Sequence, residues 1–445
     1  MFPCWISCWS SCSHTIRRRE GVKISFSLHK NGNKSQRTGR STWNERKPID
    51  GRAGQSLARP LVSYDGKRRV ETPHNRDADS RSSPTTNHTL SNPCQRKRLS
   101  NQTFFFYGHS ALIKTTGEKI RDGLKIAGWI LAPLAFILLV LMILPMGVPT
   151  FPPPRDQPLT FEAAMIAFDD VSERDRFFVD DVCVATLMHH ERKTERVYVL
   201  MHGLSNCPAQ FERIAKALYA EGHNVLIPRM PSHGLMNRFS DEPAKLKLRD
   251  VAEWAAESLE IAHGLGENVI VAGLSVNGTT ASWIAQERPD VMRVVTISPT
   301  YAPRVVPSLL QGPLGRLLVR LPNVFLWWDA GLKQDLPGPT YAAPRFPTRV
   351  IGEFMVLGNY LKKASGKSPP ACRQIRVVLS DADIGINLPL AKAITARWKK
   401  WPDRDVQEMI FPAELKVPHD MVDFNQPDQQ LEISEPALLK ILMAD

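Results

Sequence analysis

The chain has 445 residues, of which 43% are hydrophobic and 23% charged, a balance typical of a globular protein long enough for more than one domain. Its formal charge of +12 is confined to one part. Residues 1–125 hold 24 Lys and Arg against 9 Asp and Glu, whereas the rest holds 33 against 36. The basic charge therefore gives no information about the partners of the globular part, and no basic-aromatic module there points to nucleic acid.

The cysteines predict little chemistry. Four of the seven precede residue 100, and Cys183, Cys207 and Cys372 are scattered through the remainder without metal-like spacing. This pattern favours isolated buried thiols over a disulfide or a metal site. We expect neither a metal nor an organic cofactor.

Residues 1–103 are rich in Arg, Ser, Asn, Thr and Pro and show no hydrophobic periodicity, which predicts a disordered region. Their composition also resembles arbitrary translation, so the alternative that they are absent from the natural product stays open. Residues 104–125 are interpreted as a juxtamembrane segment that leads to the first strongly apolar stretch.

Residues 126–148, IAGWILAPLAFILLVLMILPMGV, are 23 consecutive residues without a charge. A bilayer needs about 20 such residues, whereas a secretory signal has an apolar core of only about 7–15. The stretch therefore predicts a transmembrane helix rather than a signal peptide or a buried core helix. We therefore expect the chain to be anchored in a membrane through residues 126–148.

Basic residues flank this span unequally. Lys and Arg occupy positions 114, 119, 121 and 125 before it, while Arg155 follows it beside Asp156. The positive-inside rule then places the N-terminus in the cytoplasm and the globular part across the membrane. Residues 149–160, PTFPPPRDQPLT, predict a stiff, extended linker.

In residues 161–445, apolar runs typical of buried strands alternate with segments of helical periodicity. The expected strands cover 196–203, 223–230, 267–275, 291–299, 374–383 and 405–414, and the expected helices cover 208–222, 246–266, 276–289 and 388–400. Such alternation predicts an α/β fold in which a mostly parallel sheet has helices on both faces.

Residues 301–370 break the alternation. They combine many prolines with apolar segments of helical periodicity and with Trp327 and Trp328. An insertion of ~70 residues is too long for a simple loop. It predicts a helical cap that folds on its own.

Polar residues that could take part in catalysis follow the expected strands. In order they are the His-Gly-Leu run at 202–204, Ser275, Asp383 and His419, and they should meet at one edge of the sheet. Serine is a weak nucleophile until a base takes its proton, and the base needs a carboxylate to fix its tautomer. His419 is the only histidine after His263, so the candidate base has no competitor downstream of the acid.

Five motifs resemble the α/β-hydrolase superfamily, closest to its lysophospholipase/monoacylglycerol-lipase-like and serine-aminopeptidase-like hydrolases. They are VLMHGLSNCPAQFERIAKAL, GHNVLIPRMPSHG, VIVAGLSVNGTTASWIAQERP, VVLSDADIGIN and VPHDMV, within about residues 180–440. Each motif is weak alone, but their order and intervals are specific together. The resemblance implies an eight-stranded type of sheet and the chain order Ser, Asp, His for the catalytic residues.

The resemblance also implies a role for each residue. Ser275 is the nucleophile on a strained turn that Gly273 permits, His419 is the base and Asp383 orients it. The N–H groups of Leu204 and Val276 form the oxyanion hole. The supporting loops then contain His202, Gly203, Asn277 and Gly278, and His233 in PSHG has a bracing role like that of His202.

Two departures from the family pattern affect these roles. Asn277 stands where the second glycine of G-x-S-x-G is expected, and Gly278 follows one position later. Because asparagine tolerates unusual backbone angles, we predict an active enzyme with a modified elbow rather than a decayed relative.

The second departure lies at the acid. The family pattern G-x-x-D-x-x-V lacks its first glycine around Asp383. Asp381 is therefore its nearest rival, and Asp420 and Asp423 are weaker ones.

Together these features predict a single-pass, membrane-anchored serine hydrolase that cleaves carboxylic esters of acyl lipids or other amphipathic molecules through an acyl-enzyme intermediate. The apolar cap with its two tryptophans motivates the lipid-like substrate, although a role in cap core explains them equally well. Alternatives are an amidase or peptidase, a thioesterase, an acyltransferase, or a catalytically silent membrane-tethered binding module. The oligomeric state stays open.

Overall fold

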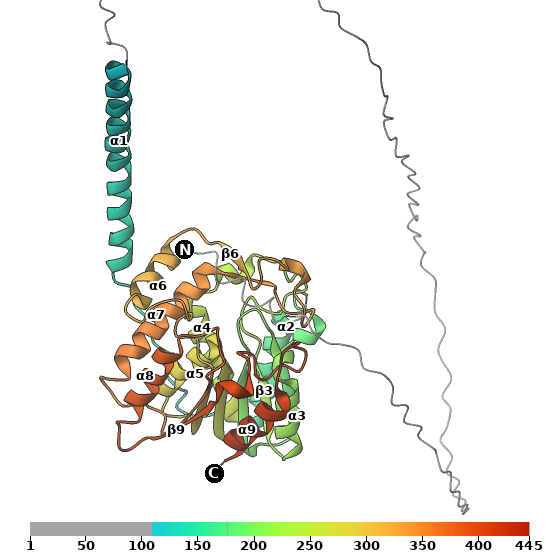
Figure 1. The fold of residues 1–445 in the computed structure, drawn as a ribbon. Helices are drawn as coiled ribbons and strands as arrows, with labels where there is room; N and C mark the ends of the chain where they lie inside the picture. Colours follow the sequence, from blue (N-terminus) through green and yellow to red (C-terminus); the bar gives the residue numbers. More distant parts are fainter. Residues whose placement is uncertain (1–108, 176, 445) are drawn as a thin grey trace, which may run out of the picture. The chain divides into compact units, whose positions relative to one another are not determined.

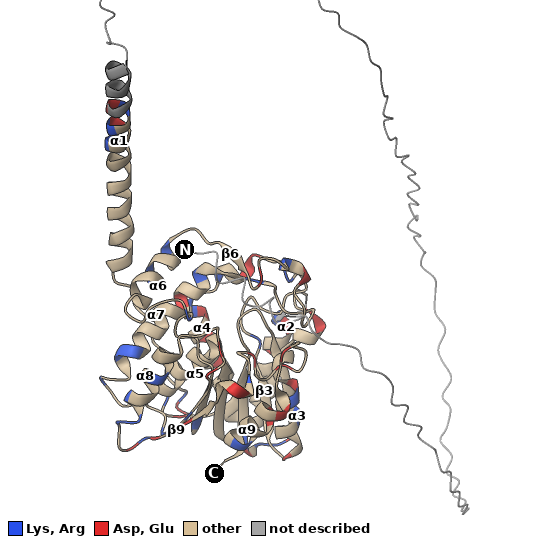
Figure 2. Cartoon of the chain, in the orientation of Figure 1, with Lys and Arg blue, Asp and Glu red and all other residues tan. Residues whose placement is uncertain are grey.

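The structure, a computed structural model, describes residues 109–175 and 177–444 (Figure 1). The predictions for residues 1–103, with the four cysteines they contain, lie outside the described residues. The first element is α1 (His109–Ile143), whose charged residues lie toward its N-terminal end (Figure 2). Within it, Glu118–Ile143 is long and apolar enough to cross a membrane by length and composition.

The helix ends earlier than the sequence suggested. α1 stops at Ile143, and residues 144–148, which we expected to be helical, have no helical structure. Pro145 has no N–H to donate and disfavours the helical conformation of the residue before it, which explains the boundary.

Seven strands form the central sheet, in the order β1-β3-β2-β4-β5-β8-β9. β1 runs antiparallel to β3, and all other neighbours are parallel. The strands are β1 (Thr186–Met188), β2 (Thr194–Met201), β3 (Asn224–Ile227), β4 (Gly266–Leu274), β5 (Arg293–Ile297), β8 (Gln374–Ser380) and β9 (Asp405–Phe411). The mostly parallel α/β sheet is confirmed.

The expectation of an eight-stranded type of sheet is wrong for the described part of the chain. The residues that precede β1 form a helix, α2 (Phe161–Asp175), instead of a further strand. Its sequence FEAAMIAFDDVSERD is rich in Ala, Met and Glu, which favour helix over strand.

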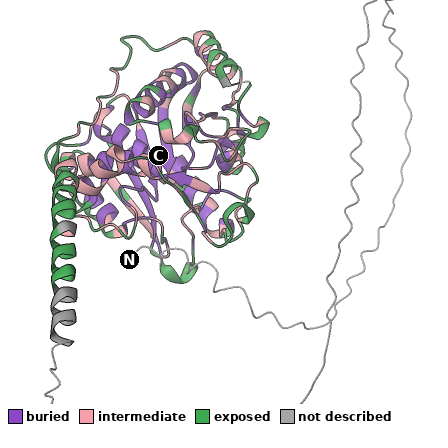
Figure 3. Ribbon diagram, turned by 90° about the horizontal axis from the view of Figure 1, so that it is seen from above, coloured by how far each residue is buried: buried purple, intermediate pink, exposed green. Residues whose placement is uncertain are grey.

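Helices cover both faces of the sheet. Along β2, Val197, Val199 and Met201 point into one core cluster, while Tyr198 and Leu200 point into the other. This period of two is what a strand buried on both faces requires, and Figure 3 shows the sheet as the buried centre of the domain. The first core includes α4 (Leu248–Leu265), α5 (Val276–Glu287) and α8 (Leu388–Trp398), and the second includes α3 (Glu212–Ala220) and α9 (Leu431–Met443).

The cap contains α6 (Gln311–Arg320), β6 (Phe325–Trp327), β7 (Arg345–Pro347) and α7 (Thr348–Ala364). It does not fold on its own as predicted, because α7 lies in the main core. Phe354 and Leu357 of α7 are buried in the same cluster as Val199 and Ile375 of the sheet. α6 then packs on α7 at Gly315 and Gly352, where an added Cβ would lie within 3.1 Å of the other glycine's carbonyl oxygen.

The expectation of isolated thiols is wrong for two cysteines. Cys183 and Cys207 form a disulfide with a Cα–Cα distance of 5.2 Å. It joins the short helix η2 (Asp181–Cys183) to the start of η3 (Pro208–Phe211), just beyond the end of β2. Cys372 is free and buried.

The linker between α1 and the domain is extended, but it is not a free spacer. Phe151 packs on Trp283 of α5 with ring centroids 4.3 Å apart. The Arg155 guanidinium binds the Glu260 carboxylate at 2.7 Å. The domain therefore holds the linker along its surface.

Candidate active site

Ser275 lies on the turn between β4 and α5 with φ 62° and ψ −120°. A non-glycine residue rarely adopts a positive φ, so the turn is strained. It is possible because Gly273 has no side chain: a Cβ there would lie 2.1 Å from the Asn277 carbonyl oxygen. Gly278 also allows α5 to approach β5 closely, since a Cβ there would lie 2.8 Å from the Ile297 carbonyl oxygen.

Three predicted residues from distant parts of the chain meet at this turn. His419 Nε2 lies 2.9 Å from Ser275 Oγ, and His419 Nδ1 lies 2.8 Å from Asp383 Oδ2. The Nδ1–H donates a hydrogen bond to the carboxylate, which leaves Nε2 free to accept the serine proton. The other oxygen, Asp383 Oδ1, accepts the Gly385 N–H at 2.7 Å, so the carboxylate is fixed at both ends.

The electrostatics match this arrangement. Burial alone would raise the pKa of Asp383, but the adjacent His419 and the Gly385 N–H lower it. Burial opposes protonation of His419, yet the charge and hydrogen bond of Asp383 raise its pKa. The pair therefore keeps a carboxylate next to a histidine whose protonated form is stabilised.

The rival carboxylates contact other groups. Asp381 pairs with Lys392 at 2.9 Å. Asp420 accepts from Gln210 Nε2 at 2.7 Å, and Asp423 accepts from Asn206 Nδ2 at 3.1 Å. Among these four carboxylates, only Asp383 accepts a hydrogen bond from His419 Nδ1.

The loop after β2 approaches the serine from the opposite side. A Cβ on Gly203 would lie 3.5 Å from the Ser275 Cβ. Leu204 and Val276 are both buried, and in the described part of the chain neither backbone N–H has a hydrogen-bond acceptor. Two unpaired N–H groups, one next to Ser275 in the chain and one next to Gly203, are thus available to an acceptor, as an oxyanion hole requires.

His202 and His233 bind backbone groups rather than the serine. His202 Nε2 accepts the Met230 N–H at 3.0 Å, and its Nδ1 donates to the Gly203 carbonyl at 3.0 Å. Burial and the neighbouring His233 lower the pKa of His202 to about 3. Burial lowers the pKa of His233 to about 4. Both rings are therefore neutral braces at physiological pH.

Sequence reasoning missed two residues that contact this site. Thr300 Oγ1 lies 3.1 Å from Ser275 Oγ, and the Thr300 N–H donates to the Ser275 carbonyl at 3.0 Å. Gln210 accepts the Gly203 N–H at 2.7 Å and donates to Asp420, the residue beside His419. Thr300 follows the end of β5 next to the serine, so the rule that polar residues gather at strand ends could have identified it.

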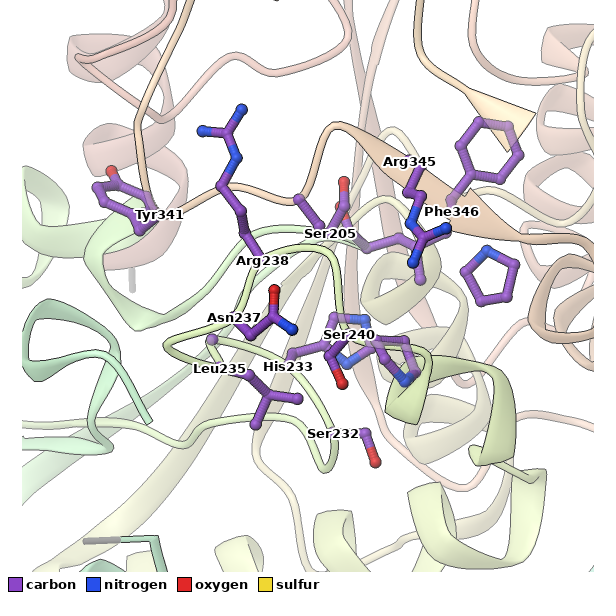
Figure 4. Close-up of a pocket in the computed structure, with 15 residues that line it drawn as sticks. Ser205, Ser232, His233, Leu235, Asn237, Arg238, Ser240, Tyr341, Arg345 and Phe346 are labelled. Carbon is purple, nitrogen blue, oxygen red and sulfur yellow. The ribbon is translucent and has the colours of Figure 1, made fainter. Parts of the chain in front are cut away.

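A pocket is lined in part by Leu204 and Ser205 of the loop after β2 (Figure 4). Its walls come from the segment after β3 and from the cap around β7, and Figure 4 shows His233, Asn237, Tyr341 and Phe346 among them. Its lining includes Leu204 but none of the three residues of the hydrogen-bonded Ser-His-Asp set. The pocket therefore adjoins the loop after β2 at Leu204 and does not enclose the serine.

Trp328 connects the cap to the same loop. Its Nε1 donates to Ser205 Oγ at 2.8 Å, and its ring packs on Phe346 with centroids 4.2 Å apart. It remains 39% exposed, so it belongs to the surface of the cap rather than to a cap core.

In the described residues, no three His, Cys, Asp or Glu side chains are grouped to hold a metal ion.

Sheet order, the strained serine turn and the hydrogen-bonded Ser-His-Asp set define the class as an α/β hydrolase. The sequence profile of the Alpha/beta hydrolase family matches residues 198–432, more than half of the chain. The chain belongs to this family.

Individual relatives are more distant. A thermostable monoacylglycerol lipase from Bacillus sp. (strain H-257) is 27% identical over 121 residues, which is 26% of this chain and 44% of the relative. The match thus spans less than half of that lipase.

Solved structures include the monoacylglycerol lipase from Paleococcus ferrophilus, with a TM-score of 0.44 and 19% identity over 58% of this chain and 97% of that one. Another is a soluble variant of the monoglyceride lipase from Saccharomyces cerevisiae, with a TM-score of 0.43 and 14% identity over 58% of this chain and 91% of that one.

Proposed function

We propose that the protein is a membrane-anchored serine hydrolase that cleaves carboxylic esters of acyl lipids or similar amphipathic molecules. The observation that carries the proposal is the continuous hydrogen-bonded set of Ser275, His419 and Asp383. His419 takes the proton from Ser275 Oγ as the oxygen attacks the ester carbonyl, and Asp383 stabilises the resulting imidazolium. The alcohol then leaves with a proton from His419, and water attacks the acyl-enzyme in the same way.

The negatively charged oxygen of each tetrahedral intermediate would accept hydrogen bonds from the N–H groups of Leu204 and Val276. Loss of one side-chain donor of this kind typically costs about 3–4 kcal/mol in barrier height. The strained Ser275 backbone supports the same role, since strain of this kind gathers at reactive sites.

Two observations support an apolar acyl group. The cap presents Trp328 and Phe346 beside the oxyanion loop. The partial match to a monoacylglycerol lipase points to the same substrate class.

The anchor in the proposal is α1. Two cap arginines bind the end of this helix: Arg316 donates to the Met142 carbonyl at 2.7 Å, and Arg320 donates to the carbonyls of Leu141 at 2.7 Å and Pro145 at 3.0 Å. Cationic side chains complement the C-terminal end of a helix, whose last carbonyls lack partners. The hydrolase domain would then sit directly at the membrane surface.

The side of the membrane follows from two independent features. Basic residues gather before the span, which favours a cytoplasmic N-terminus. The Cys183–Cys207 disulfide favours an oxidising compartment for the domain. Both support our proposal that the domain lies on the extracytoplasmic side.

The test uses the full chain reconstituted in nanodiscs. We expect hydrolysis of p-nitrophenyl esters with acyl chains of increasing length, and covalent labelling by a fluorophosphonate probe. Ser275→Ala should abolish both, whereas Ser308→Ala, a cap serine outside the site, should retain both.

The outcomes separate the alternatives. Labelling of Ser275 without ester turnover would favour an amidase, thioesterase or acyltransferase, which parallel assays with amide and thioester substrates distinguish. Neither labelling nor turnover would indicate a silent binding module and would refute the proposal.

A further inference from the structure

Asn277 is completely buried although it occupies a position where the family pattern has glycine. It stands two residues after Ser275, in the first turn of α5. Its side chain leaves the helix toward the end of β2, and Nδ2 donates to the His202 carbonyl at 2.6 Å. A glycine at this position could not make this bond.

The orientation of the amide is determined by its neighbours. A carbonyl oxygen can only accept, so the nitrogen of the amide faces His202. The Thr280 hydroxyl donates to Asn277 Oδ1 at 3.0 Å, and the Met230 sulfur lies 3.4 Å from Nδ2. The amide is therefore held on both ends inside a low-dielectric environment, where a hydrogen bond is strong and its loss is costly.

The bond joins the two segments that carry the proposed oxyanion donors. Val276, one donor, directly precedes Asn277 in the chain. Leu204, the other donor, lies two residues after His202. The distance between α5 and the loop after β2 therefore sets the distance between the two N–H groups, and the Asn277 amide bridges that gap.

We propose that Asn277 is a positioning residue that fixes the separation of the Leu204 and Val276 N–H groups. It does not touch the substrate. It acts by holding the His202–Leu204 segment against the first turn of α5, while Gln210 accepts the Gly203 N–H of the same segment. This inference rests on the proposed function, because it assigns a role within that reaction.

The role predicts a specific kinetic signature. A misplaced donor weakens binding of the tetrahedral intermediate but barely changes binding of the ester itself, so kcat falls while KM holds. Removing a donor outright costs about 100- to 1,000-fold in kcat, so loosening one should cost about 10- to 30-fold. A purely structural role would instead lower stability without this split.

The experiment compares wild type, Asn277→Gly and Asn277→Ala in the full chain, with a water-soluble p-nitrophenyl ester. We expect kcat to fall about 10- to 30-fold and KM to change less than about threefold. Affinity for a trifluoromethyl ketone, which forms a tetrahedral adduct with an oxyanion, should fall by the same factor as kcat/KM. The melting temperature of each variant monitors folding.

A second pair of variants keeps Asn277 in place. Thr280→Val removes the hydroxyl that orients the amide, whereas Thr280→Ser retains it. We expect Thr280→Val to lose about three- to tenfold in kcat and Thr280→Ser to match wild type. This pair decides the question if the Asn277 variants do not fold.

Three results would overturn the inference. Asn277→Gly could keep the wild-type kcat and inhibitor affinity, Thr280→Val could equal Thr280→Ser, or KM could rise while kcat holds. A wild-type protein without ester turnover or fluorophosphonate labelling would instead refute the proposed function, and the inference with it.

Discussion

The carboxyl edge of the sheet and the outer cap are held together in different ways. At the sheet edge, buried side-chain amides and hydroxyls connect one loop to the next: Asn277 joins α5 to the loop after β2, and Gln210 joins that loop to Asp420. In the outer cap, hydrogen bonds lie at the surface: Arg238, on the segment after β3, donates to the cap carbonyls of Thr340 and Gln334.

The difference has a physical consequence. Buried polar bonds act in a low dielectric and leave a costly unpaired group when one partner is lost, whereas exposed ones exchange readily with water. The buried bonds therefore hold the loops of the sheet edge in fixed positions. The surface bonds of the outer cap resist a shift of that segment much less. Substitutions at the edge should change kcat, and substitutions in the cap should change access.

The largest effect should come from Asp383→Asn. The amide favours the wrong tautomer of His419, so kcat should fall by about 1,000- to 10,000-fold. Because Asp383 raises the pKa of His419, its removal should also move the acidic limb of kcat/KM to lower pH. Asp381→Asn is the matched control, since Asp381 pairs with Lys392, and its pH–rate profile should match wild type. The reverse pattern would assign the acid to Asp381.

The disulfide holds the loop after β2 to η2 beside the sheet edge and should have the next largest effect. Cys183→Ser with Cys207→Ser removes a cross-link that spans 24 positions, which should lower the free energy of unfolding by about 3 kcal/mol. Denaturant unfolding of the variant and of wild type under reducing conditions measures this. Cys372→Ala serves as the comparison variant, because it changes a buried thiol that forms no disulfide. Equal stability of oxidised and reduced wild type would contradict the prediction.

Thr300→Val should have a smaller effect at the sheet edge. Its hydroxyl holds Ser275 Oγ at 3.1 Å, so its loss lets the nucleophile leave the line to His419. We expect kcat to fall about three- to tenfold, the equivalent of one hydrogen bond. Thr300→Ser keeps the hydroxyl and should restore most of the rate. Equal rates for the valine and serine variants would show that Thr300 acts by packing alone.

Much of the sheet edge was predictable because its residues follow strands. Ser275, Asp383 and His419 each follow an apolar run in the chain order that this fold uses, so periodicity and topology together bring them to one edge. The strand positions followed from continuous apolar runs for the same reason. The expected eighth strand was not found in the described residues, because that expectation came from the family and the local sequence of 161–175 favours helix.

What the sequence left open depends on contacts between distant segments. Pairing of Cys183 with Cys207 requires η2 to fold back onto the loop after β2, which no spacing rule reveals. Apolar periodicity identified α7 as a helix but not that its face joins the sheet core instead of a separate cap core. The role of Asn277 depends on a carbonyl 75 positions away in the chain.

The smallest catalytic effect should come from the other end of the cap. Arg316→Ala with Arg320→Ala removes the bonds to the carbonyls of Leu141, Met142 and Pro145, far from Ser275 in the chain. Turnover of a water-soluble ester should change less than about twofold, because none of these bonds reaches Ser275, His419 or Asp383.

The local effect at the anchor should be larger. Each lost bond is worth about 1 kcal/mol, a factor of about five, so amide hydrogen exchange in residues 141–150 should accelerate at least about fivefold in nanodiscs. Arg304→Ala, an exposed cap arginine whose side chain does not contact α1, serves as the matched control and should leave exchange unchanged. Unchanged exchange in the double variant would mean that the packed linker, through Phe151 on Trp283, is sufficient to hold the domain to its anchor. The cap would then be free to move independently of the membrane helix.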